Sequence, residues 1–137
     1  MQSNALKKWH SLLEHHDDQV LYDLLADDVV FISPVVHTPQ LGKRITHAYL
    51  TAANKVLNSG HFEYCRTFET DSAAVLEFET KIGDVSVNGI DIISWDANDQ
   101  ITEFKVMVRP LKAMQALHAA MGAELERLAK AQQADGS

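Results

Sequence analysis

The sequence has few of the residues on which several common kinds of site depend. Cys65 is the single cysteine among 137 residues, which excludes an internal disulfide and a cysteine zinc site and fits a reducing compartment. The six glycines form no Gly-x-Gly-x-x-Gly or Gly-Lys-Ser/Thr arrangement, so the common phosphate-binding loops are excluded. The longest apolar runs, such as 29–32, are far shorter than the ~20 residues that span a bilayer.

Positive charge is also scarce. Twelve basic residues stand against nineteen acidic ones, giving a formal net charge of −7. Nucleic acid and anionic membranes are therefore not expected as partners, because both are bound by a basic surface. The N-terminal segment has no apolar core or cleavage site of a signal peptide, so a cytoplasmic location is expected. With 46% hydrophobic and 23% charged residues, the composition predicts one globular domain over residues 1–137.

The first half of the chain has helical spacing around one short strand. Ser3 or Asn4 can cap a first helix, whose apolar side chains form one stripe: Leu6, Trp9, Leu12 and Leu13. Asp17 and Asp18 can cap a second helix, which we expect to end at 27–28. The other segments predicted here are a strand at 29–33, a proline-bounded irregular stretch across His37, and a helix at 43–57.

The second half changes to strand spacing. Four strand-like runs, separated by turn compositions, cover 61–70, 73–82, 85–95 and 101–109. In the second run apolar residues alternate with charged ones, which is typical of an antiparallel meander with one buried face. Pro110 ends the last strand and opens a long helix. Helices followed by antiparallel strands predict the α+β class, with helices packed on one face of a curved sheet.

Two motifs carry a resemblance to a known family. Asp-Asp-Val-Val-Phe-Ile-Ser-Pro at 27–34 follows the second helix, and Gly-Ile-Asp-Ile-Ile-Ser-Trp-Asp at 89–96 lies in the third long strand. With this order of elements, the chain resembles the nuclear transport factor 2-like superfamily, and within it the SnoaL-like and ketosteroid-isomerase-like proteins. The similarity covers about residues 3–110, so 111–137 is expected to be a C-terminal helical extension of the single domain.

The resemblance implies a particular architecture. The fold would be a cone-shaped, cystatin-like α+β barrel, in which a curved antiparallel sheet wraps around the N-terminal helices. A pocket would lie at the open end of the cone. Many members of the superfamily pair sheet to sheet, so a homodimer is expected. The superfamily includes isomerases, cyclases, dehydratase-like proteins and members that only bind a ligand.

Of three functional residues in ketosteroid isomerases, one is kept. The aspartate that moves the proton, directly before a proline, corresponds to Ser33, and a serine hydroxyl is a very poor base. The tyrosine on the first helix corresponds to Trp9, whose indole N–H donates one hydrogen bond but cannot transfer a proton. The strand aspartate corresponds to Asp91. Ketosteroid isomerisation by the family mechanism is therefore not expected.

Asp91 also stands out without the resemblance. Strand alternation places it on the face of Val87, Ile93 and Trp95, where an apolar environment would raise the pKa of its carboxyl group. A carboxyl group with a raised pKa in an apolar pocket can act as a general acid or base, or donate a hydrogen bond to a carbonyl. The alternatives are a structural ion pair with Arg109, Lys105 or a histidine, or exposure on the outer face.

Several other polar residues have competing interpretations. His37 could relay a proton to Asp91 or bind a substrate oxygen, or it could be a loop histidine in solvent. The run at 15–18, His-His-Asp-Asp, is interpreted as an inter-helix turn and not a metal site, because adjacent residues rarely converge on one ion. Cys65 lacks the basic surroundings of a reactive thiolate. Met121 is expected to be a core or dimer contact.

The sequence thus predicts a homodimeric barrel that binds a small apolar molecule bearing a carbonyl or hydroxyl group. Catalysis, if present, would be proton transfer next to the carbonyl, of the isomerase or cyclase type, with Asp91 as acid/base, His37 as helper, and no cofactor or metal. The predicted pocket wall comprises Trp9, Leu13, Phe31, Ser33 and Tyr49 in the first half and Phe78, Trp95 and Met107 in the second. A non-catalytic binding protein and a structural homodimer remain the alternatives.

Overall fold

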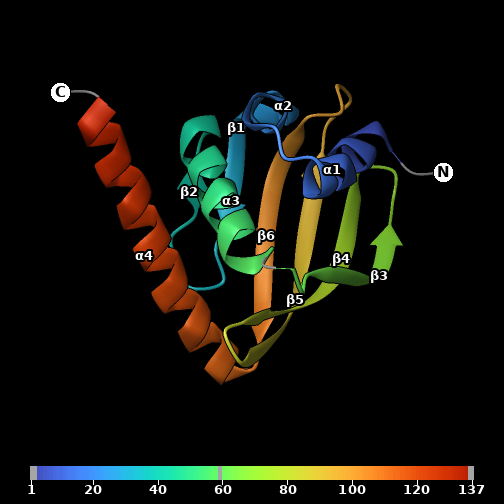
Figure 1. The fold of residues 1–137 in the computed structure, drawn as a ribbon. Coiled ribbons are helices and arrows are strands. Elements are labelled where there is room, and N and C mark those ends of the chain that lie inside the picture. The colour runs from blue at the N-terminus through green and yellow to red at the C-terminus, as the bar shows by residue number, and fades with distance from the viewer. Residues whose placement is uncertain (1–2, 59, 136–137) are drawn as a thin grey trace.

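The computed structural model describes residues 3–58 and 60–135, and within them four helices and a six-stranded sheet (Figure 1). Two helices, two strands and a third helix come first, four strands follow, and one long helix ends the chain, which confirms the predicted α+β class. The last two residues of the predicted C-terminal extension, 136 and 137, lie outside the described part. Within that part, no helix combines the length and the hydropathy needed to cross a bilayer.

Three helices form in the first half, each at a predicted position: α1 (Asn4–Glu14), α2 (Asp18–Leu24) and α3 (Lys43–Leu57). The hydroxyl of Ser3 accepts the N–H of Leu6 at 3.1 Å and caps α1. The carboxylate of Asp17 accepts two N–H groups at the start of α2. However, α2 ends earlier than predicted, because the backbone becomes extended at Leu25.

The sheet has the strand order β2-β1-β6-β5-β4-β3. Its strands are β1 (Leu25–Ile32), β2 (Gln40–Leu41), β3 (Glu63–Glu69), β4 (Ala73–Ile82), β5 (Val85–Trp95) and β6 (Ile101–Arg109). β3 to β6 form the predicted antiparallel meander. β1 pairs with β6 in parallel, after a register shift between Leu25 and Val30. The acidic pair at 27–28 lies in this shifted stretch of β1, exposed, and not at a helix end as predicted.

The inner face of the sheet packs against the N-terminal helices. Along β5, buried residues alternate with half-buried ones, and Val87, Asp91 and Ile93 share the buried face, as alternation predicted. The core between sheet and helices is aromatic: the ring centroids of Trp9 and Phe104 are 4.9 Å apart in an edge arrangement. Burial of this face on one side only explains the alternating pattern of the meander.

The C-terminal helix α4 (Leu111–Asp135) lies along one side of the molecule, next to α3 (Figure 1). It packs against α3 and also contacts β4, β5 and β6. Ala113 and Leu117 are buried in this contact. The helix is therefore part of the wall around the space between α3 and the sheet.

Candidate ligand-binding site

A chain of two hydrogen bonds links α1, β3 and β5 inside the barrel. The indole Nε1–H of Trp9 donates to the hydroxyl oxygen of Tyr64 at 2.9 Å. The Tyr64 hydroxyl in turn donates to Oδ2 of Asp91 at 2.6 Å. Each donor in this chain has one acceptor, so the orientation of the Tyr64 O–H bond is fixed by its two neighbours.

Burial changes the acid–base behaviour of both titratable groups in this chain. Loss of solvent raises the pKa of Asp91 to about 7, although the hydrogen bond from Tyr64 opposes the shift. Burial, together with the negative charge of Asp91, raises the pKa of the Tyr64 hydroxyl well above its usual value. Near neutral pH Asp91 therefore exists in both protonation states, whereas Tyr64 keeps its proton.

The two polar groups line a cavity of about 220 Å³. This is roughly the volume of seven water molecules in the liquid and somewhat below the range of about 300–1,000 Å³ common for drug-sized ligands. The wall is mostly apolar, with contributions from α1, β1, α3, β3, β5, β6 and α4. The cavity is therefore small and mostly apolar, with few polar groups on its wall.

Six of the residues predicted for the site line this cavity: Trp9, Leu13, Phe31, Ser33, Tyr49 and Asp91. They come from two helices (α1 and α3), two strands (β1 and β5) and the loop after β1. Phe31 and Tyr49 also contact each other, with ring centroids 5.3 Å apart. Asp91 is 6% exposed and bonds to Tyr64, whereas Arg109 donates to Oδ1 of Asn88 at 3.4 Å. The ion pair between Asp91 and Arg109 does not form.

The other four predicted residues lie outside the cavity wall. His37 is exposed on the loop between β1 and β2. Phe78 is fully buried beneath Phe62, its ring stacked at a centroid distance of 5.2 Å. The indole of Trp95 donates to the carbonyl oxygen of Asp71 at 3.2 Å, and Met107 is 46% exposed on the outer face of the sheet.

Ser33 lies where the resemblance implied the proton-transferring aspartate, and its side chain bonds to the backbone. Its hydroxyl oxygen accepts the N–H groups of Val35 at 3.0 Å and Val36 at 3.3 Å. These bonds fold the loop after β1 over the cavity, since the neighbouring residues 34–36 also line it. With two N–H donors on its oxygen, Ser33 holds the loop in shape and offers no base to the cavity.

Two titratable groups of the cavity were missing from the sequence-based prediction. Tyr64 lies on the inner side of β3, opposite Phe78 of β4 in the register. Extending the strand alternation across the two turns of the meander would have placed Tyr64 and Asp91 on the same face. His118 of α4 lines the cavity as well, and so does Met121, which was expected to be a core or dimer contact. Their placement depends on how α4 docks, which local spacing does not determine.

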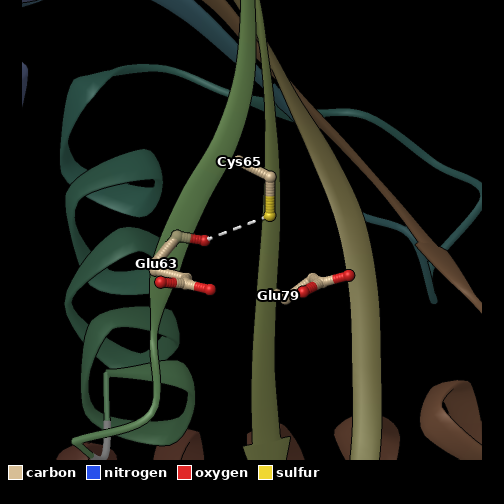
Figure 2. Close-up of side chains that lie close together, drawn as sticks. All are labelled: Glu63, Cys65 and Glu79. Carbon is tan, nitrogen blue, oxygen red and sulfur yellow. Dashed lines mark hydrogen bonds between the residues drawn. The ribbon is translucent and has the colours of Figure 1, made fainter.

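A second group of side chains gathers at an exposed site on β3 and β4. Figure 2 shows Glu63, Cys65 and Glu79, whose potential ligand atoms lie within 4.8 Å of one another. Partial desolvation and the negative charges of Glu79, Glu77 and Glu63 raise the pKa of the Cys65 thiol. A thiol that stays protonated is a poor nucleophile, which agrees with the interpretation of Cys65 as unreactive.

The structure is similar to several solved structures, although no family model and no curated protein matches the chain. A steroid delta-isomerase from Pseudomonas aeruginosa is 34% identical, with 97% of each chain covered and a TM-score of 0.84. An uncharacterised bacterial protein with a cystatin-like fold, from Silicibacter pomeroyi, is 28% identical, with 88% of this chain and 84% of that chain covered and a TM-score of 0.80.

A more distant structure shares the fold alone. It is a protein from Shewanella putrefaciens classed as a SnoaL-like polyketide cyclase, with 17% identity, 84% of each chain covered and a TM-score of 0.63. The identity of 34% over nearly the whole length of the isomerase is enough to establish common family membership, and the cystatin-like fold agrees with the predicted architecture.

Proposed function

The chain belongs to the nuclear transport factor 2-like, SnoaL-like superfamily, and we propose that its cavity binds a small apolar ketone and transfers a proton next to the carbonyl group. The observation that carries this proposal is the Trp9–Tyr64–Asp91 chain at an otherwise apolar cavity. The names of two similar structures, a steroid delta-isomerase and a SnoaL-like polyketide cyclase, support a ligand of this type.

Asp91 acts as the acid in this proposal. When it is neutral, Oδ2 keeps the hydrogen bond from Tyr64, and a proton on the other carboxyl oxygen is available to the ligand. A carbonyl oxygen in the cavity can accept that proton in a hydrogen bond, which strengthens as negative charge develops on the oxygen during enolisation. Burial supports this role because it raises the pKa of Asp91 to about 7 and keeps the neutral form populated.

A non-catalytic binding protein with the same cavity is the second candidate. It is favoured by the loop after β1, where Ser33 bonds to backbone N–H groups and His37 is exposed, so that the loop supplies no base. Both candidates predict ligand binding, and only the first predicts proton exchange.

The experiment that separates them uses 2-tetralone, a bicyclic ketone with exchangeable α-protons. We expect isothermal calorimetry to detect binding and NMR in D₂O to detect α-deuteration faster than in buffer alone. Binding without accelerated exchange would support the binding protein. Neither binding nor exchange would contradict both candidates for this class of ligand.

Replacing Tyr64 by Phe should move the pH dependence of ketone binding upward. A ketone only accepts hydrogen bonds, so its affinity should fall as Asp91 loses its proton near pH 7. The Tyr64 hydrogen bond lowers the pKa of Asp91, and its removal, worth about 1.5–3 kcal/mol for a charged acceptor, should raise the midpoint by about 1–2 pH units. Calorimetric titrations from pH 5 to 9 measure this midpoint.

Tyr22 offers the matched control, because it is a partly exposed tyrosine outside the cavity. Tyr22→Phe should leave the midpoint of the wild-type protein unchanged. An unchanged or lowered midpoint in Tyr64→Phe would show that Asp91 does not govern ketone binding.

We also propose that the outer face of the sheet pairs two copies of the chain. Phe68 is 61% and Met107 46% exposed there, and half-buried Ile90 and Ile92 lie between them in the register. Charges of both signs flank this apolar strip, including the ion pair of Arg66 with Glu77 and the side chain of Lys105. A face with both signs can be complementary to itself across a two-fold axis.

Met107→Glu should therefore convert a dimer to a monomer. In the variant dimer each subunit would bury one carboxylate in the middle of an apolar interface, without a partner of opposite charge. Light scattering coupled to size exclusion, at micromolar concentration, measures the mass. Leu41→Glu is the control, because Leu41 is 72% exposed on the edge strand β2 and should not affect assembly. A monomeric wild-type protein or a dimeric Met107→Glu variant would refute the pairing.

A further inference from the structure

His118 is a titratable side chain of the cavity that the proposed function does not yet use. It projects from α4, the helix that packs against α3, whereas Asp91 and Tyr64 belong to the sheet. We infer that His118 is the base of the proton transfer and takes the α-proton of the ketone while Asp91, held in place by Tyr64, donates to the carbonyl oxygen. This inference rests on the proposed function and identifies the proton acceptor that the proposed proton transfer requires.

The reaction needs a proton acceptor separate from the acid. In the proposed complex one oxygen of Asp91 donates to the carbonyl oxygen and the other accepts the hydrogen bond of Tyr64, so neither is free to take the α-proton. The remaining titratable groups on the cavity wall are Tyr49, Tyr64 and His118. Phenols keep their proton at neutral pH, whereas a neutral imidazole has a free lone pair. Among the residues that line the cavity, His118 is therefore the one that is suited to accept a proton.

The position of His118 on α4 fits this role. Leu117, next to it, is 3% exposed and fastens this part of the helix to the core. His118 itself is exposed and also lines the cavity, which places it at the mouth. Among the side chains described, those of residues 3–58 and 60–131, none forms a hydrogen bond or ion pair with it. Its imidazole is thus in contact with both solvent and ligand space.

Gly122 keeps space open beside this imidazole. It follows His118 by four residues, so the two positions lie one above the other on the helix surface. A glycine inside a helix is destabilising relative to alanine. Gly122 nevertheless lines the cavity, and a Cβ there would have no described atom within 4 Å. The missing side chain leaves the mouth of the cavity free next to His118.

The step conserves atoms and electrons without a co-reactant. The imidazole lone pair takes the α-proton, and the electron pair of the C–H bond forms the C=C bond of the enolate. The carbonyl π electrons move to oxygen, which the carboxyl proton of Asp91 stabilises. In D₂O the imidazolium exchanges its proton with solvent and returns deuterium to carbon. The net result is α-deuteration of an otherwise unchanged ketone.

Binding and exchange of 2-tetralone by His118→Gln test the inference. We expect the affinity to stay within about 3-fold of wild type, because Asp91, which donates to the ketone oxygen, remains. The exchange rate should fall at least about 100-fold, the usual contribution of a general base. His15→Gln, an exposed histidine outside the cavity, is the matched control and should exchange at the wild-type rate. Added imidazole should restore part of the exchange in His118→Ala, since the mouth is open.

Each other outcome overturns the inference in a different way. Wild-type exchange in His118→Gln would remove His118 as the base and leave the proposed function intact. If the wild-type protein binds 2-tetralone without accelerating the exchange of its α-protons, the inference and the proton transfer are both refuted, and only the binding function remains. Wild-type protein that neither binds nor exchanges would remove the proposed function together with the inference.

Discussion

Asp91→Asn should exchange the α-protons of 2-tetralone at least about 100-fold more slowly than wild type, while folding more stably at pH 8. The amide can still accept the hydrogen bond of Tyr64 and donate an N–H to a carbonyl, so binding should persist. However, an amide cannot supply the acidic proton that stabilises the enolate oxygen. Ketone binding by the variant should also lose its dependence on pH near 7, because the titrating group is gone.

The gain in stability follows from the burial of the carboxyl group. Folding raises its pKa from 3.8 to about 7, so the folded state holds a proton that the unfolded state has released. At pH below 3.8 both states are protonated and Asp91 has no electrostatic cost. Between pH 4 and 7 the wild-type protein loses stability relative to the variant by about 1.4 kcal/mol per pH unit. Above pH 7 the difference levels off at up to about 4 kcal/mol.

Urea unfolding of both proteins at pH 4, 6 and 8 measures this difference, in which the contributions of the other carboxylates cancel. Asp84→Asn, in the exposed turn between β4 and β5, is the control and should track wild type at every pH. A stability difference that does not grow between pH 4 and 8 would contradict a buried, partly neutral Asp91. Unchanged exchange in Asp91→Asn would remove its role as the acid.

The elements of the fold that could be predicted are those specified by neighbouring residues. Ser3 and Asp17 cap helices through bonds to N–H groups two or three residues later, and the sequence shows both. The short turn at 83–84 sets the register of β4 and β5, and alternation then turns Asp91 inward. The early end of α2 was missed, because Asp27 and Asp28 resemble a helix stop but lie in a shifted part of β1.

The parts of the site that could not be predicted depend on contacts between distant segments. The Tyr64–Asp91 bond reaches across β4, which separates β3 from β5, so nothing near Tyr64 in the sequence indicates its acceptor. His118 enters the cavity through the docking of α4 on α3. Met107 was predicted to line the pocket and does not. Its neighbour Val106 lies on the inner face of the sheet, so strand alternation places Met107 on the outer face.

Gly89 lies where the packing of the core meets the candidate site. Its replacement by alanine should lower the free energy of unfolding by about 3 kcal/mol. A Cβ at this position would lie 2.5 Å from Cζ of Phe78 and 2.7 Å from the carbonyl oxygen of Met107. The ring could shift, but the carbonyl is part of the β5–β6 ladder and cannot move without breaking it. Phe78 stacks on Phe62, and the Phe62 ring contacts Tyr64 with centroids 5.0 Å apart.

Urea unfolding of Gly89→Ala, Phe78→Leu and the double variant measures the coupling between the two positions. Phe78→Leu removes the ring but not the carbonyl contact, so Gly89→Ala should cost less in that background without becoming neutral. Gly122→Ala is the matched control: its Cβ meets open space within a helix, so the same substitution should stabilise by up to about 1 kcal/mol. Equal effects at both glycines would mean that the close approach of Phe78 and the Met107 carbonyl oxygen does not require a glycine at position 89.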